Sequence, residues 1–311
     1  MPVAAKEGLN QFQKLLIGSW NNQALPNATG GEGGTENPLS YTVMPIPQDP
    51  GYILKNFTYY ETVKFEGEND VSRPVSAHNR GGSTLQASTT LFYGQNVHFA
   101  DGPGKDLLVH VENGAWLNLA TGEKLTGPYP PPPESGIHLH DPNQQPPQIM
   151  IAKLASIPHG NSVLAMGSIS GPLDGAPSIP DAPSVLPTPE GLDTRPYTTK
   201  LDDPKNYQNP LPDFTANTNK PLQMAIDLIN PDKHICWVVS TGNQGQTMNI
   251  PFERRAANVT EYKAAYWLLS NDGGATYQYL AYTQNITMQF TIDGKHYNFP
   301  HVTSNVVTKA C

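Results

Sequence analysis

The feature that most constrains the fold is a long series of segments in which apolar and polar residues alternate. Strict alternation is typical of a β-strand that buries one face, because successive side chains point to opposite sides of a sheet. We predict strands over residues 39–46, 53–65, 84–92, 95–100, 106–111, 115–120, 148–157, 162–169, 235–241, 246–252, 257–269, 277–292 and 295–307. The chain is therefore expected to be an all-β protein.

Turn-forming sequences separate several of these segments. Asn113-Gly114 is a strong two-residue hairpin signal, so we predict that the chain reverses there. Pro158–Asn161 and Asn271–Gly274 indicate two further hairpins, and Asp293-Gly294 indicates the last one. Strands that follow one another through hairpins form an antiparallel up-and-down meander.

Composition agrees with this picture and narrows the range of partners. Hydrophobic residues make up 37% and charged residues 15%, while 27 Gly and 31 Pro interrupt helices and favour turns. The net charge of −8 argues against nucleic acid as a partner. We expect a small apolar ligand instead, and the sequence gives no indication of the oligomeric state.

Two helices and one proline-rich segment depart from the strand pattern. Apolar residues at helical spacing predict an amphipathic helix over 4–17 and a short helix over 221–229. Residues 172–215 hold many prolines and few large apolar residues, so they cannot form the interior of a sheet. We predict one barrel domain over 1–311, built from strand blocks 18–171 and 235–307 around this excursion.

A sheet of this size would leave two long unpaired edges if it stayed flat. Closure into a barrel removes both edges. We therefore predict a large antiparallel up-and-down barrel of about 10–12 strands with a short N-terminal helix. Two separate sandwiches are the alternative, but the C-terminal block alone has too few strands to cover both faces of a sandwich.

Segments that would direct the chain to a membrane are not evident. No stretch reaches the roughly 18 apolar residues that a spanning helix needs, and the first 16 residues lack the apolar core of a signal peptide. Cys236 and Cys311 are expected to be free thiols in a reducing compartment. These features predict a cytoplasmic protein.

Four segments of the chain resemble motifs of known barrel proteins. Gly18-Ser19-Trp20 follows the first helix, as in lipocalin-like and fatty-acid-binding-protein-like barrels, where the Trp closes the floor. The other three segments are Glu112–Leu117, Ala155–Ser162 and Tyr279–Val302, the last of which ends in Phe299-Pro300-His301-Val302. In order and spacing the four segments resemble a family of heme-binding, nitrobindin-like barrels over most of the chain.

The resemblance implies heme as the cofactor and suggests how it is bound. His301 resembles the proximal ligand of the heme iron, and His159 would be a distal group above the barrel mouth. Trp20 and Trp116 belong to the matching segments and are candidates for lining the cofactor site. The simpler alternatives are a strand histidine bonded to a neighbour at 301 and a loop-stabilising histidine at 159.

Two further groups of residues are candidates for binding. His138 and His140 would share one side of a strand and lie near enough to hold one metal ion, although histidines at this spacing are common by chance. Arg254 and Arg255 are candidates to bind a carboxylate, with a solvated charge pair as the alternative.

Aromatic residues recur along the strands, and those at alternate positions should face inward. A barrel of more than about eight strands is hard to fill with side chains alone, so we expect an apolar cavity. The leading hypothesis is binding of heme or another flat apolar molecule, with peroxidase-like or gas-binding reactivity. Alternatives are a cofactor-independent cyclase or isomerase acting on an apolar substrate, and a purely structural β protein. No motif in the sequence identifies a catalytic residue.

Overall fold

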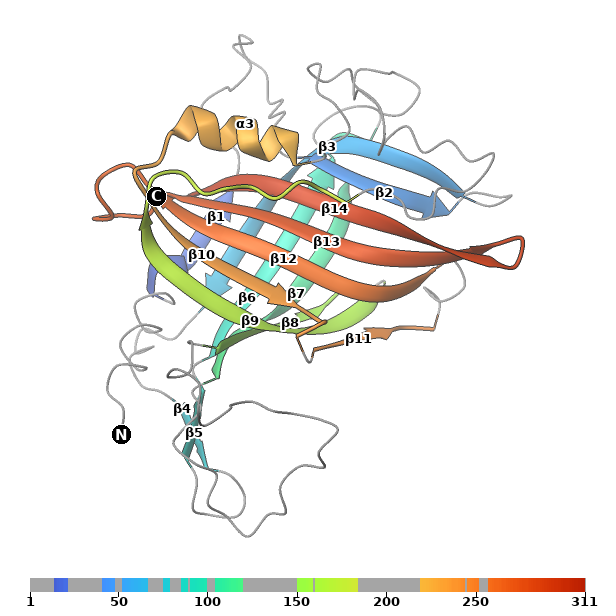
Figure 1. Ribbon diagram of the computed structural model, residues 1–311, viewed down its shortest axis with the longest axis horizontal. Coiled ribbons are helices and arrows are strands. Elements are labelled where there is room, and N and C mark those ends of the chain that lie inside the picture. The colour runs from blue at the N-terminus through green and yellow to red at the C-terminus, as the bar shows by residue number, and fades with distance from the viewer. Residues whose placement is uncertain are drawn as a thin grey trace.

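A closed antiparallel barrel of ten strand positions forms the body of the protein, as predicted (Figure 1). The computed structural model describes residues 14–21, 41–47, 52–66, 75–78, 85–88, 90–99, 104–119, 150–158, 160–183, 219–243, 245–251 and 257–310. The ring contains β1 (Gly18–Asn21), β2 (Tyr41–Pro47), β3 (Tyr52–Glu66), β6 (Thr90–Phe99), β7 (Leu108–Leu119), β8 (Met150–Ser156), β9 (Asn161–Asp174), β10 (Lys233–Ser240), β12 (Asn258–Ser270), β13 (Tyr279–Ile292) and β14 (Lys295–Lys309). Lying off it are β4 (Val75–His78), β5 (Leu85–Ser88), β11 (Gln246–Asn249) and the helix α3 (Lys220–Ile229).

The ring closes at a position that β1 and β2 share between β3 and β14, which we call the seam. At one end β1 pairs with both neighbours, and Trp20 lies opposite Val63 and Lys309. At the other end β2 does the same, with Val43 opposite Val302. Both segments run antiparallel to β3 and β14, so together they act as the first strand of the barrel.

The strands on either side of the proline-rich excursion, β9 and β10, pair with each other. These strands pair over eight residues or more of each chain segment, from Lys233 opposite Asp174 to Ser240 opposite Met166. The proline-rich excursion between them therefore does not interrupt the ring. Its described part includes α3, which begins and ends within one residue of the predicted helix.

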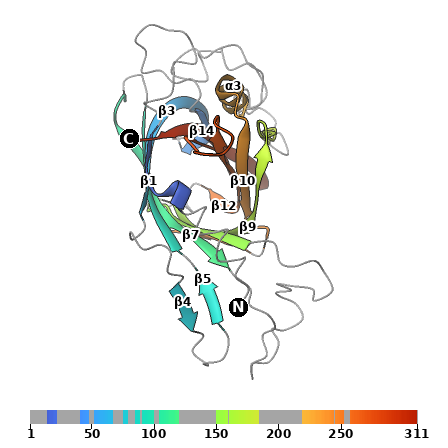
Figure 2. The same cartoon turned by 90° about the vertical axis from the view of Figure 1, so that its left-hand side faces the viewer.

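The helix α3 packs on the outside of the barrel (Figures 1 and 2). Leu222, Ala225 and Ile226 are buried against outward-facing residues of β12, β13 and β14, among them Trp267 and Val306. The side chains at alternate positions of these strands point the other way, into the barrel interior.

One end of the interior is filled by the start of the described chain. Residues 14–16 form a helical turn that lies inside the ring of strands in Figure 2, in dark blue. Leu16 and Trp20 are both fully buried, and the Trp20 indole Nε1 donates a hydrogen bond of 2.7 Å to the Leu16 carbonyl. This buried contact closes one end of the barrel interior, which we call the floor.

The predicted hairpin at Asn113-Gly114 is wrong, because β7 continues straight through both residues. Gly114 faces the interior, and a Cβ there would lie 1.9 Å from the Leu154 carbonyl oxygen and 2.9 Å from the Tyr93 hydroxyl. The glycine is therefore required because the Leu154 backbone and the Tyr93 side chain approach this position closely, and it does not form a turn. The hairpin signals at Asn271–Gly274 and Asp293-Gly294 are confirmed by the pairing of β12, β13 and β14.

Two other features qualify the predicted series of strands. The segment predicted at 246–252 is the short β11, which pairs with β9 outside the ring. Among the residues described, no helix has the length and apolar character needed to cross a membrane.

Candidate functional site

The centre of the barrel holds a buried lysine, Lys153 of β8. Its neighbours Ile151 and Ala155 at alternate positions face the same apolar interior, so the strand pattern carries the charged side chain inward. The Lys153 ammonium lies 2.9 Å from Glu112 Oε1, and it donates hydrogen bonds of 2.7 and 2.8 Å to the Tyr262 and Tyr266 hydroxyls. Three N–H donors thus meet acceptors on β7 and β12.

Glu112 of β7 completes this group, which we call the Lys153 cluster. The Tyr93 hydroxyl donates a 2.6 Å hydrogen bond to Glu112 Oε1, and His110 Nε2 lies 3.8 Å from Oε2. Burial favours the neutral acid, but Lys153 and His110 outweigh burial and hold the pKa of Glu112 well below its usual range. Lys153 in turn has a raised pKa, because Glu112 outweighs the effect of burial. The pair is therefore ionised inside the barrel.

A second carboxyl group, Glu61 of β3, is surrounded by neutral polar side chains. Glu61 Oε1 accepts hydrogen bonds of 2.7 Å from the Tyr282 hydroxyl and from Asn305 Nδ2, and Gln95 Nε2 donates to Oε2. The Tyr59 hydroxyl lies 3.1 Å from that of Tyr282 and donates to the Ser304 carbonyl. We call these residues the Glu61 cluster.

The Glu61 cluster lies at the seam. On β3, residues 59–61 fall between the residues that pair with β2 and those that pair with β1. Side chains of Tyr59 and Glu61 here reach β14 directly. Burial raises the pKa of Glu61, and the hydrogen bonds from Tyr282, Gln95 and Asn305 offset only part of that effect.

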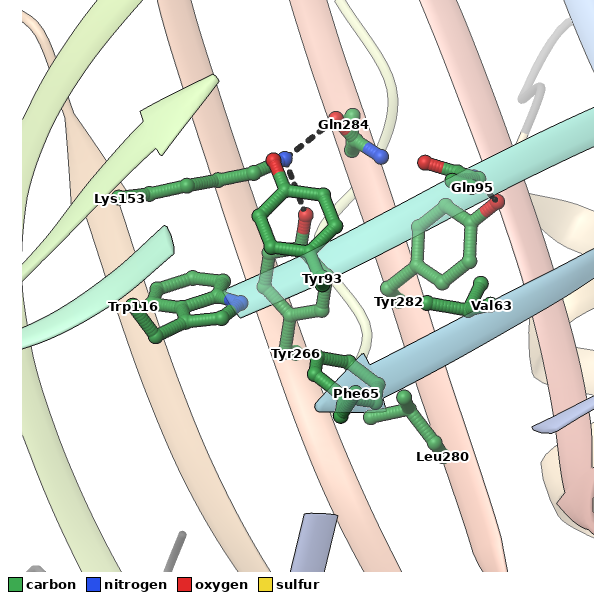
Figure 3. Close-up of a pocket in the computed structure, with 10 residues that line it drawn as sticks. All are labelled: Val63, Phe65, Tyr93, Gln95, Trp116, Lys153, Tyr266, Leu280, Tyr282 and Gln284. Carbon is green, nitrogen blue, oxygen red and sulfur yellow. Dashed lines mark hydrogen bonds between the residues drawn. The ribbon is translucent and has the colours of Figure 1, made fainter. Parts of the chain in front are cut away.

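A small cavity lies between the two clusters (Figure 3). Its volume is ≈ 20 Å³, which is room for about one water molecule. Its polar boundary comes from Lys153, Tyr266 and Gln284 on one side and Gln95 and Tyr282 on the other, and its remaining lining residues are Val63, Phe65, Tyr93, Trp116 and Leu280. The cavity is therefore polar at the end where the two clusters face each other, which we call the polar end, and apolar along its other walls.

Two glutamine amides give this polar end its directionality. Gln284 Oε1 accepts from Tyr262 at 2.7 Å and from Lys153 at 3.3 Å, whereas Gln95 Nε2 donates to Glu61. The other atom of each amide, Gln284 Nε2 and Gln95 Oε1, has no hydrogen-bond partner among the residues described. In Figure 3 these two atoms point toward one another.

Aromatic rings form a rigid wall beside the cavity. Tyr266 stacks on Trp237 with ring centroids 5.5 Å apart, and Trp116 meets Tyr266 edge-on at 5.1 Å. Tyr282 lies 5.6 Å from Tyr266. Because Tyr266 and Tyr282 are also held by hydrogen bonds, a flat ligand placed here would meet fixed aromatic faces.

The structure brings together only some of the residues that the sequence suggested. Trp116 lines the cavity, and Trp20 lies in the floor of the barrel, outside the lining. His301 pairs with Ile286, an inward-facing residue, so its side chain is half-buried on the inner side of β14. His159, His138, His140, Arg254 and Arg255 lie outside the described residues, and their predicted roles stay predictions.

The cavity does not fit a heme. A macrocycle is many times larger than the single water molecule that this space holds, and none of the lining residues is a histidine. The described part of the chain also contains no group of three His, Cys, Asp or Glu side chains placed to hold a metal ion. On β14, Thr303 lies opposite the lining residue Gln284, and His301 is the next inward-facing residue along the strand. Iron ligation by His301 stays a prediction.

The charged residues at the centre were missed from the sequence. Lys153 and Glu61 each occupy a position that alternates with apolar residues: Lys153 lies between Ile151 and Ala155, and Glu61 between Tyr59 and Val63. A charged residue on the apolar face of a strand is a signal for a buried pair or a binding site. That signal was available for these two residues but not for Glu112, whose neighbours at alternate positions are His110 and Gly114.

Comparisons with known proteins show structural likenesses but no sequence relative. No protein-family model matches the chain, and no curated protein sequence matches it. The crystal structure of Rv2717c from M. tuberculosis is similar with a TM-score of 0.43 and 14% sequence identity, covering 100% of this chain and 99% of that one.

Proposed function

We propose that the barrel binds a small, flat and largely apolar molecule in the cavity between the Lys153 and Glu61 clusters. The observation that carries this proposal is the convergence of five polar side chains and several apolar ones on one space inside the barrel. A mostly apolar pocket with a few oriented polar groups is typical of small-molecule sites. The buried ion pair supports the same reading, because such pairs contribute little to stability but are common at functional sites.

Binding requires the cavity to enlarge, and the contacts indicate which lining side chains would move. Tyr93, Tyr266 and Tyr282 are tied by hydrogen bonds and are expected to stay in place. Phe65 and Leu280 are held by apolar packing alone. A ligand is therefore expected to displace Phe65 and Leu280 and to occupy the space beside the fixed rings.

The test is a titration with 2-naphthol, read by fluorescence of the tryptophans beside the cavity. Phe65→Leu frees space in the wall, so the variant should bind 2-naphthol about tenfold more tightly than the unaltered protein, which corresponds to about 1.4 kcal/mol. Phe92→Leu is the matched control, since Phe92 is 62% exposed on the outer face. Leu280→Ala provides a second enlarged cavity in case Phe65→Leu fails to fold. Equal affinities in all the folded variants would overturn the proposal.

Hemin should be titrated into the same protein as a separate ligand, because heme is the cofactor that the resemblance implies. If heme were the ligand, adding hemin would produce a Soret band whose position changes in His301→Ala. A band that is absent, or that is unchanged by this substitution, would remove His301 as the iron ligand. The naphthol site and the heme site would thus be tested separately.

A second candidate function is a cofactor-independent cyclase or isomerase. The observation that favours it is the Tyr266 hydroxyl, which lines the cavity and accepts a 2.8 Å hydrogen bond from the Lys153 ammonium. Burial raises the pKa of Tyr266 and the Lys153 ammonium offsets only part of that rise, but the ammonium would stabilise the phenolate left after proton donation to a substrate in the cavity. Under this hypothesis Tyr266→Phe abolishes turnover and preserves ligand binding, whereas unaltered turnover would exclude Tyr266 as the acid.

A further inference from the structure

The charges around the cavity are already balanced before any ligand enters. Of the ten residues that line it, Lys153 is the one with a positive charge, and Glu112 neutralises it at 2.9 Å. Glu61 lies behind Gln95 and Tyr282 and adds a second acid on the opposite side. His110 lies beyond Glu112, at 3.8 Å. A ligand in this space therefore meets no uncompensated positive charge from the lining residues.

An anionic group would be strongly disfavoured here. It would leave water for a buried space whose single cation is already paired, and burying an unpaired charge is costly. It would also approach the ionised Glu112 carboxylate, and like charges repel. A cationic group would lie beside the Lys153 ammonium, and like charges repel. Both kinds of charged ligand are thus selected against.

The two free amide atoms specify what a neutral ligand should carry. Gln284 Nε2 is a donor, so it calls for an acceptor on the ligand. Gln95 Oε1 is an acceptor and calls for a donor. A site with a buried donor and a buried acceptor discriminates against ligands that leave either one unpaired.

We propose that the ligand of this barrel is a neutral planar aromatic molecule with a hydrogen-bond acceptor and a donor side by side, such as a carboxamide. In this arrangement Gln284 Nε2 donates to the carbonyl oxygen and Gln95 Oε1 accepts from the N–H group, while the rings of Trp116 and Tyr266 flank the aromatic body. The proposal rests on the proposed function and makes it more specific, since it excludes carboxylates such as fatty acids.

The test compares two ligands of matched shape, 2-naphthamide and 2-naphthoate, at pH 7 with the Phe65→Leu protein. The carboxylate should bind about 100-fold more weakly than the amide, because its charge finds no unpaired cation. Affinity is read from tryptophan fluorescence and confirmed by calorimetry. The 2-naphthol titration in the same protein reports whether the cavity binds at all.

Each outcome separates this inference from the proposed function. If 2-naphthoate binds as tightly as 2-naphthamide or more tightly, the inference is overturned while cavity binding stands. If neither compound nor 2-naphthol binds, both proposals are overturned.

A pair of variants tests the role of the amide directly. Gln284→Met removes the donor and should reduce the preference for 2-naphthamide over 2-naphthoate by about tenfold or more. Gln246→Met is the matched control, because Gln246 is exposed on β11, outside the ring. An unchanged preference in a folded Gln284→Met protein would overturn the assignment of Gln284 as the donor.

Discussion

The barrel buries two carboxyl groups to a similar depth and treats them in opposite ways. Glu112 is 3% exposed and Glu61 is 0% exposed, yet the pKa of Glu112 is lowered and that of Glu61 is raised. The difference is the neighbour: Lys153 contacts Glu112, whereas neutral phenol and amide groups contact Glu61. Depth sets the cost of a charge, and the partner determines whether the charge is kept.

The Lys153 cluster should be the more sensitive of the two to loss of one member. Lys153→Met leaves the Glu112 carboxylate buried without its cation, so the free energy of unfolding should fall by about 3–5 kcal/mol. Urea denaturation at pH 7 measures the change. Lys233→Met is the control, since Lys233 pairs with Asp174 in solvent and its removal should leave the midpoint nearly unchanged. Equal losses in the two variants would show that burial of the pair is not decisive.

Removing both charges together should cost less than removing the cation alone. In Lys153→Met combined with Glu112→Gln, neither partner is left as an unpaired charge. A double-mutant cycle by urea denaturation should give a coupling energy of about 1–3 kcal/mol between the two residues. Additive effects of the single substitutions would contradict an ion pair at this position.

The two clusters should also respond to pH with opposite signs. The folded protein favours protonated Glu61, so stability from Glu61 is present below its ordinary pKa of 4.5 and decreases as pH rises above it. Each unit of the raised pKa corresponds to about 1.4 kcal/mol. Glu61→Gln should remove this decrease above pH 4.5, as measured by urea denaturation at several pH values.

The Glu112 contribution changes in the other direction. The folded protein favours ionised Glu112, so its stabilisation is present above pH 4.5 and is lost as pH falls below that value. The combined Lys153→Met and Glu112→Gln protein should therefore lose less stability in acid. If both carboxyl substitutions changed the pH profile in the same direction, the contrast between the clusters would be refuted.

The smallest expected effect concerns one hydrogen bond at the seam. Tyr59→Phe removes the hydroxyl that donates a 3.1 Å bond to the Ser304 carbonyl and lies 3.1 Å from the Tyr282 hydroxyl, and it should lower the free energy of unfolding by about 1 kcal/mol. Tyr60→Phe is the control, because Tyr60 faces outward and bonds to Asp106 in solvent. Similar losses would indicate that the Glu61 cluster does not contribute to closure of the barrel.

Alternation along the strands was enough to predict the fold class, because period two depends only on which residues face the core. The turn prediction failed at Asn113-Gly114, because a glycine is needed there to make room for residues of two other strands. Local turn propensity cannot register that Leu154 and Tyr93 approach this backbone from across the sheet. The same limit explains why β11 was counted with the ring.

The site was harder to predict than the fold. Aromatic residues at inward positions indicated Trp116 as a candidate, and it does line the cavity. The contacts of Lys153 join β8 to β7, β12 and β13, over sequence separations of up to 131 residues. No spacing in the sequence encodes such pairings, so the sequence pointed to histidines as site residues and did not point to Lys153.

The seam has a consequence for the order of folding. Its outermost pair, Trp20 and Lys309, joins residues 289 positions apart (309 minus 20), whereas the β13–β14 hairpin closes across Asp293-Gly294. Long loops cost more entropy to close and form later than local hairpins. We therefore expect the sheet to assemble hairpin by hairpin as an open, curved intermediate. Pairing of β14 with β1 and β2 then closes the ring in the last and slowest step, the one most exposed to strand exchange with another copy of the chain.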